Sequence, residues 1–373
     1  MSTYKEICTI CGISYFVKLN TRQSGCRPIL MKLHKGDIVV NPFTLQLVAA
    51  PIRRRVSKRK YESSGEDICN WHIRICSVNN FPTAAGLASS AAGYACLVYA
   101  LGQVYGVEGD LSSVARQGSG SACRSMYGGV VHWYKGDSED GVDSVARPIA
   151  PVDHFPDLQV IICVANASRK KTGSTDGMKR TIKTSSLMVY RVKESVPQRT
   201  EKMMEALESK NWSDVCDLAM SDSNEMHAVC LDTFPPCVYM NDTSHMVASL
   251  VHRYNDVKVS QGRYTNKVCY TFDAGPNACL FVPATVVDEF MALLLHAFPP
   301  ALSQNLSDYV RGPQTNAVTL PQEMLSLVDD DYQSGQLKFI IHTKVGDGPR
   351  LLDESSSLLD PVTGEPKVQE DAS

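Results

Sequence analysis

The chain has 373 residues, 43% of them hydrophobic, which is enough to build two ordinary hydrophobic cores. Its formal net charge of −3 argues against nucleic-acid binding, because phosphate backbones select for a cationic excess. No run approaches the roughly 20 apolar residues of a membrane span, and no signal-peptide pattern opens the chain. The 13 cysteines are scattered, many of them in apolar runs, as in proteins of reducing compartments. We therefore expect a cytoplasmic protein without nucleic-acid or membrane partners.

Residues 1–51 contain strand-like pieces but no motif that defines a fold. Cys8 and Cys11 have the spacing of a zinc or redox dithiol, yet no second cysteine pair follows at zinc-finger distance, so we disfavour both. The basic run Arg53–Lys60 fits a localisation signal or an anion-binding patch, but a solvated helix face is the interpretation we favour.

The segment Asn79–Gly93 is rich in small residues and lies between a predicted strand and a predicted helix. Trp71–Val78 alternates apolar and polar side chains like a strand. After the small residues, apolar side chains recur at helical spacing, at Tyr94, Leu97, Val98, Leu101 and Val104. Pro82 and Gly86 would shape the turn, and the alanines leave backbone N–H groups accessible at the positive end of the helix. The segment suits a nucleotide phosphate; a tightly packed, alanine-rich helix start without a ligand is the alternative.

A second loop of small residues, Gly118–Arg124, follows a short helix that we expect from an N-cap at Asp110 to Arg116. Its glycines let the backbone approach a ligand, and Arg124 supplies a planar fork for carboxylate or phosphate. A plain turn would look similar, but the position between Asn79–Gly93, here named the phosphate loop, and a strand at Val130–Tyr134 favours a ligand contact.

The rest of the chain predicts a sheet and a set of helices. Leu158–Val164 is a continuous apolar run, typical of a strand buried on both faces. A cluster of cations and hydroxyls follows that suits a polyanion, although a solvated loop would look similar: Lys170, Lys171, Thr172, Ser174 and Thr175. From Ser185 to about Tyr254 the apolar period is helical. Its histidines, His227, His245 and His252, lack the spacing and partners of a metal site, so we expect core or surface roles for them.

Two strands, Val268–Phe272 and Asn277–Val282, flank the sharp turn Asp273–Pro276. Asp273 is placed at a strand end in apolar surroundings, where a carboxylate either forms the turn or is held rigidly as a general base. A helix over Thr285–His296 and a late strand over Leu337–Lys344 are also expected.

Four stretches together resemble the diphosphomevalonate decarboxylase family of the GHMP kinase superfamily: Ser77–Gly93, Gly118–Ser125, Lys171–Met178 and Tyr270–Ala278. The resemblance runs from about Ile52 to the C-terminus. It implies an α+β, two-lobed GHMP-kinase-like fold. Residues 1–184 would form the N-terminal nucleotide lobe, with 1–51 atypical for the family, and residues 185–373 the C-terminal α/β lobe.

The resemblance also implies the reaction: ATP-dependent decarboxylation of mevalonate 5-diphosphate to isopentenyl diphosphate, a step of the mevalonate pathway to isoprenoids and sterols, with Mg²⁺ and a homodimer. Asp273 and Arg124 would be catalytic. The implied substrate-binding residues are Ser119, Gly120, Ser121, Ala122, Cys123, Arg124, Ser174 and Thr175. The implied ATP-binding residues are Asn80, Pro82, Gly86, Leu87, Ala88, Ser89 and Ser90, with Ser90 also at the metal.

The sequence departs from the family at residues 1–51. The family pattern has an N-terminal substrate-binding strand there, and the nearest fragment, Tyr15–Lys18, does not align with it. A catalytically impaired or binding-only homologue that binds ATP but decarboxylates poorly therefore stays open, as does a sibling small-molecule kinase that stops at phosphoryl transfer.

Overall fold

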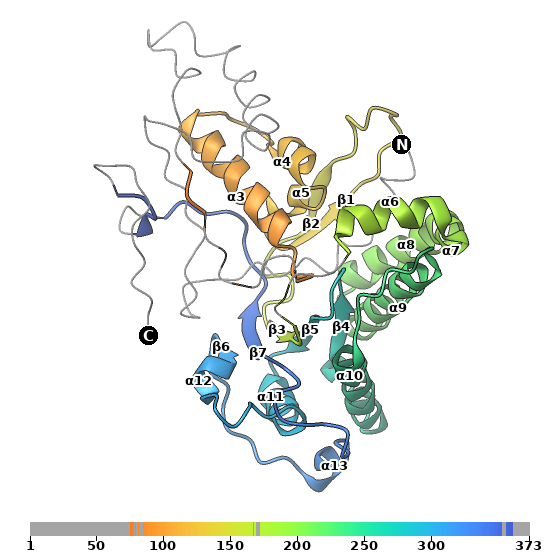
Figure 1. The fold of residues 1–373 in the computed structure, drawn as a ribbon, viewed down its shortest axis with the longest axis vertical. Helices are drawn as coiled ribbons and strands as arrows, with labels where there is room; N and C mark the ends of the chain where they lie inside the picture. The colour runs from red at the N-terminus through yellow and green to blue at the C-terminus, as the bar shows by residue number, and fades with distance from the viewer. Residues whose placement is uncertain are drawn as a thin grey trace, which may run out of the picture.

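The computed structural model describes residues 75–77, 79, 81, 85–166, 168, 172–352 and 356–360 (Figure 1). The expectations for residues 1–51, for Arg53–Lys60 and for most of the strand Trp71–Val78 lie outside the described residues. Among the described helices, none is long and apolar enough to cross a membrane.

The first described layer is a group of helices beside a two-stranded sheet. Helices α3 (Ser89–Val104), α4 (Ser112–Gly118) and α5 (Ala122–Ser125) contact one another. Strands β1 (Val130–Trp133) and β2 (Ala146–Ala150) pair antiparallel next to α5. The buried side chains of α3 lie at helical spacing on one face and include Ala91, Ala95, Val98 and Leu101, which confirms the helix expected after the small residues.

The second sheet has five strands in the order β4-β5-β3-β7-β6 (Figure 1). Their bounds are Leu158–Val164 for β3, Cys269–Phe272 for β4, Ala278–Pro283 for β5, Val310–Arg311 for β6 and Phe339–Lys344 for β7. β3 is central, antiparallel to both β5 and β7, and its last five residues are buried, as the continuous apolar run predicts. Since β3 precedes residue 184, this sheet spans the lobe boundary that the resemblance implies.

Helices cover this sheet and extend from it. After β3 come α6 (Ser174–Thr184), α7 (Ser186–Tyr190), the π-helical turn η3 (Arg191–Ser195), α8 (Val196–Glu208), α9 (Trp212–Asp232) and α10 (Asp242–Ser260). After a 3₁₀ turn, η4 (Tyr264–Asn266), the later helices are α11 (Val287–Ala297), α12 (Leu306–Tyr309) and α13 (Gln322–Leu325). The predicted helical region from Ser185 and the predicted α11 are confirmed.

One local expectation, the N-cap of α4, is wrong by one residue. Helix α4 begins at Ser112, and its N-cap is Leu111, one residue after the predicted Asp110. The Asp110 carboxylate accepts a hydrogen bond from the Ser112 N–H at 2.7 Å. Helix α6, for which the sequence pattern made no prediction, begins at Ser174, after Gly173 in an extended conformation. Polar residues fill most of α6, which hides its period from a search for apolar spacing.

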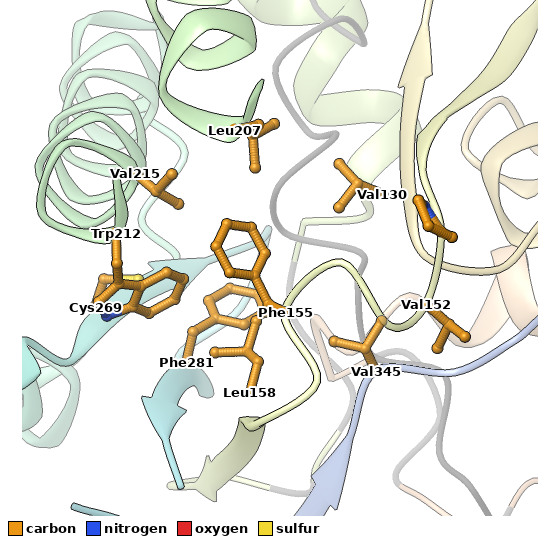
Figure 2. Close-up of a pocket in the computed structure, with 11 residues that line it drawn as sticks. Val130, Val152, Phe155, Leu158, Leu207, Trp212, Val215, Cys269, Phe281 and Val345 are labelled. Atoms are coloured by element: carbon orange, nitrogen blue, oxygen red, sulfur yellow. The ribbon is translucent and has the colours of Figure 1, made fainter. Parts of the chain in front are cut away.

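A small apolar cavity of about 20 Å³ lies between the five-stranded sheet, the α8–α9 corner and β1. Figure 2 shows Phe155, Leu158 and Phe281 gathered beneath Leu207. The cavity has room for about one water molecule but offers almost no polar partner to hold one. None of the described residues that the sequence predicts for the site lines this cavity, so we assign it no role in substrate binding.

A buried lysine on α10 pairs with a partly buried glutamate on α11. Lys258 is 1% exposed, and its Nζ lies 2.6 Å from the Glu289 carboxylate. The Tyr254 hydroxyl donates to the same carboxylate at 2.8 Å, and the Lys258 ammonium stands over the Tyr254 ring. Removing one member of such a pair leaves the other charge buried without compensation.

We therefore expect Glu289→Gln to lower the free energy of unfolding by about 3 kcal/mol, because the Lys258 ammonium loses its counter-charge inside the protein. Urea unfolding followed by circular dichroism measures the change. The control is Asp347→Asn, which removes the partner of Arg350 from an ion pair whose side chains are both 44% exposed. It should cost less than about 1 kcal/mol. Equal effects of the two substitutions would show that burial does not set the strength of the Lys258 pair.

Candidate active site

The start of α3 has the properties of an anion site. The helix is preceded by Ala88 in the left-handed conformation (φ 54°, ψ 31°), and an alanine at this N-cap position has no side-chain acceptor for the first-turn N–H groups. A non-glycine residue in that region costs about 1 kcal/mol or more, and such strain concentrates at functional sites. The N–H groups of the first turn carry the positive end of the helix dipole, beside the hydroxyls of Ser89 and Ser90.

The phosphate loop touches the Asp273 turn backbone to backbone. Gly86 has a positive φ of 80°, and a Cβ there would stand 2.7 Å from the Gly275 Cα. A Cβ on Gly275 would stand 2.5 Å from the Ala85 carbonyl oxygen. Both distances are too short for real carbon contacts, so the approach requires glycine on both sides. Asp273 lies two residues before this contact.

The Asn277 side chain stabilises the contact between the phosphate loop and the Asp273 turn. Its Nδ2 donates to the Ala85 carbonyl at 2.8 Å and to the Asn166 carbonyl at 2.9 Å, and its Oδ1 accepts from the Asn166 N–H at 3.0 Å. The residue is 2% exposed. One buried amide therefore joins the phosphate loop, the segment after β3 and the strand that follows the Asp273 turn.

The second small-residue loop lies against α3. The Ser119 hydroxyl is 3.2 Å from that of Ser90, and Gly118 packs so closely on Tyr94 that a Cβ would stand 2.0 Å from its ring. The carbonyls of Ser119 and Ser121 accept from N–H groups three residues on, at 2.9 and 3.1 Å. The loop is therefore a helical turn leading into α5.

Arg124 is held nearly buried on α5. It is 3% exposed, and its guanidinium carbon lies 5.5 Å from the centre of the Trp133 ring. The neighbouring Cys123 thiol donates to the Gly120 carbonyl at 3.1 Å, and burial raises its pKa to about 11 against the opposing charge of Arg124. Ala122 and Cys123 are fully buried, so any contact they make with a ligand would come from their main chain.

Tyr239 connects the Asp273 turn with the first turns of α6. Its ring packs with Ala274 and Cys237 in a small buried cluster. On the other side its hydroxyl lies where a Cβ on Gly177 would be only 2.2 Å away. Burial raises the pKa of Tyr239, and the charge of Asp273 contributes to the rise. Through this ring, the turn that carries Ser174 and Thr175 is placed relative to Asp273.

The structure thus brings together three of the predicted stretches directly: Gly86–Ser90 meets the Asp273 turn and the Ser119–Arg124 turn. Ser174 and Thr175 join them through Tyr239. Asn80 and Pro82 lie outside the described residues. Sequence reasoning assigned no role to Asn277 or Tyr239; Asn277 stands inside a recognised stretch, whereas no local signal marks Tyr239.

Two family models match the chain. The model of the diphosphomevalonate decarboxylase-like N-terminal domain matches residues 33–146, and that of the mevalonate 5-diphosphate decarboxylase C-terminal domain matches residues 160–352. The chain is 48% identical over 313 residues to the diphosphomevalonate decarboxylase of Rattus norvegicus, a match that covers 83% of this chain and 76% of the rat protein.

The chain belongs to the diphosphomevalonate decarboxylase family.

Solved structures of the family agree with the fold. Mevalonate diphosphate decarboxylase from Trypanosoma brucei superposes with a TM-score of 0.75 at 32% identity, covering 88% of this chain and 87% of that one. A structure described as MDDEF in complex with MVAPP, AMPPCP and magnesium has a TM-score of 0.58 at 28% identity, covering 72% of this chain and 79% of that one. The α+β GHMP-type fold is therefore confirmed. The N-terminal family match starts at residue 33, ahead of the Ile52 at which the sequence resemblance was expected to begin.

The glycine contact predicts the effect of one methyl group. Gly275→Ala should lower kcat/KM for decarboxylation by about 10²-fold, because the new Cβ must push the Ala85 carbonyl and with it the phosphate loop away from Asp273. Steady-state kinetics measures this. Gly93→Ala adds the same methyl group within α3, where nothing lies within 4 Å, and should keep parental kinetics. A Gly275→Ala enzyme with parental kcat/KM would show that the contact is not needed for the site.

Proposed function

We propose that this chain catalyses the ATP-dependent decarboxylation of mevalonate 5-diphosphate to isopentenyl diphosphate. The observation that carries the proposal is the direct contact between an anion-binding helix start and a turn bearing a single carboxylate, Asp273. Membership of the family supports it, as does the family structure described as containing MVAPP, AMPPCP and magnesium.

The reaction needs two events in one site. ATP phosphorylates the tertiary 3-hydroxyl of the substrate, which turns a poor leaving group into a good one. Departure of that phosphate gives cationic character at the carbon, which expels the carboxylate as CO₂ and leaves isopentenyl diphosphate, ADP and phosphate. The protein has to place the hydroxyl in line with the terminal phosphate and hold two polyanions together.

In this proposal, separate groups of residues bind ATP, orient the substrate hydroxyl and bind the substrate anion. The first-turn amides of α3, with Ser89 and Ser90, hold the ATP phosphates, and Asp273 orients the substrate hydroxyl and accepts its proton. Arg124, together with Ser119, Gly120 and Ser121, holds the substrate anion, with Ser174 and Thr175 on the far side of Tyr239. Because Arg124 is nearly buried, its charge acts in a low-dielectric environment, where its attraction to an anion is stronger than in water.

Mg²⁺ fits this donor set as a partner of ATP. Among the described residues there is no group of three or more His, Cys, Asp or Glu that could hold a metal, whereas Mg²⁺ commonly binds through phosphate oxygens and one or two protein oxygens. Ser90, at the start of α3, would supply the protein oxygen. The ion would neutralise phosphate charge during transfer.

We further propose a cytoplasmic location and a homodimer, in a pathway that leads to sterols. The described cysteines are all free thiols, which supports a reducing compartment. The division into lobes at residues 184 and 185 also remains a proposal.

Simultaneous measurement of CO₂ and ADP from mevalonate 5-diphosphate and ATP tests the function. Equal amounts of the two products support the decarboxylase. ADP without CO₂ would identify a kinase, and binding of both ligands without either product would identify a binding-only homologue.

Asp273→Asn should lower kcat by 10² or more, roughly the contribution of a positioned general base, with ATP affinity nearly unchanged. Single-turnover kinetics and ATP titration measure the two quantities. Asp256→Asn makes the same chemical change at an exposed position of α10 and should behave as the parent. A parental kcat for Asp273→Asn would remove this carboxylate from the mechanism.

Arg124→Lys should raise KM for mevalonate 5-diphosphate by about tenfold or more, because an ammonium cannot reproduce the two-donor guanidinium fork. Initial-rate kinetics at saturating ATP gives the value. The same substitution at Arg116 on α4, whose guanidinium donates to the Gly141 carbonyl at 2.9 Å, is the matched control. If both variants keep the parental KM, the anchoring role of Arg124 is wrong.

A further inference from the structure

Two side chains of helix α9 hydrogen-bond to the backbone N–H and C=O of Phe272, the residue immediately before Asp273. The Ser223 Oγ accepts a hydrogen bond from the Phe272 N–H at 3.0 Å, and the His227 Nε2 lies 3.3 Å from the Phe272 carbonyl oxygen. Ser223 is 4% exposed and His227 8% exposed. We propose that Ser223 and His227 form a clamp on Phe272 that positions the Asp273 carboxylate for the reaction. The inference rests on the proposed function.

The clamp acts where the sheet offers no partner. Among the described strands β4 lies at one edge of the sheet, and Phe272 pairs with Ala278 of β5 on its inner side only. Unpaired backbone groups at a buried edge are costly, and a strand end without partners can shift. Two side chains of α9 therefore take the place of a neighbouring strand at the last residue of β4.

The exit from the turn is held in a similar way from α10. The Ser244 hydroxyl donates to the Pro276 carbonyl at 2.7 Å, and Asn277 is fixed by its own amide bonds. The turn from Asp273 to Pro276 is thus bounded on one side by the clamp and on the other by Ser244. These two anchors restrict the backbone of the turn, and with it the position from which the Asp273 side chain extends.

His227 is suited to positioning because it stays neutral. A carbonyl oxygen only accepts hydrogen bonds, so the bond to Phe272 requires the proton on Nε2. Burial lowers the pKa of His227 to about 4, and the nearby Asp273 and His245 shift it in opposite directions. The ring also stands edge-on to Phe272 and Tyr239. Near neutral pH the clamp therefore places no positive charge beside Asp273.

The test compares two substitutions at one position. His227→Leu removes the donor and should lower kcat by about ten- to a hundredfold with KM for ATP unchanged, since small misplacements of a reacting group have effects of that size. His227→Gln keeps an N–H donor at a similar reach and should recover kcat to within about threefold of the parent. The pH profile of kcat should be the same for the parent and His227→Gln, because a positioning residue transfers no proton.

The control is His154→Leu, which removes a bond of the same kind from His154 Nε2 to the Leu207 carbonyl (2.7 Å) in another part of the protein. It should keep the parental kcat. A His227→Leu enzyme with parental kcat, or a His227→Gln enzyme as impaired as His227→Leu, would overturn the clamp.

A second variant covers the case in which His227→Leu does not fold. Ser223→Ala removes only the acceptor for the Phe272 N–H, and we expect a three- to tenfold lower kcat from it. If Ser223→Ala then has the parental kcat, the clamp is wrong. A parent chain that binds ATP but releases no CO₂ would overturn the proposed function and the clamp together, whereas an active parent with insensitive variants overturns the clamp alone.

Discussion

The candidate site depends on one steric constraint: Gly86 and Gly275 lie so close that neither can carry a side chain. This contact sets the start of α3 against the β4–β5 turn, and therefore sets the first-turn amides, which we propose bind the ATP phosphates, against the turn that begins with Asp273. Asn277 keeps the two backbones together from a fully enclosed position. The relative position of the two loops is thus set mainly by backbone atoms, as a precisely held site requires.

Helix α9 connects the strand before the Asp273 turn with the helices that follow β3. Its residues Asp222 and Glu225 form a partly buried cluster with Arg191 and Arg199, which anchors η3 and α8. Ser223 and His227, on the same helix, hydrogen-bond to Phe272 of β4 instead. Polar residues so enclosed require partners, and here the partners lie on different elements. One helix therefore contacts both its helical neighbours and β4, the strand that ends immediately before Asp273.

The sequence predicted the parts of the fold that depend on local patterns. The apolar run Leu158–Val164 matches β3 residue for residue, and α11 begins two residues after its predicted start. The start of α6 was missed because its residues are mostly polar, and propensity is weak there. The meeting of Gly86 with Gly275 and the role of His227 are long-range, and no periodicity carries such information. The family resemblance named the stretches that meet, but not the bonds that hold them.

Two titratable neighbours of Asp273, His227 and Tyr239, contribute to the electrostatic environment of its carboxyl. Burial lowers the pKa of His227 and raises the pKa of Tyr239, so both are neutral near pH 7. Neither ring presents a charge to the Asp273 carboxyl. In the proposed reaction these two rings therefore position the Asp273 turn through a hydrogen bond to Phe272 and through packing against Ala274, and they add no charge of their own to the site.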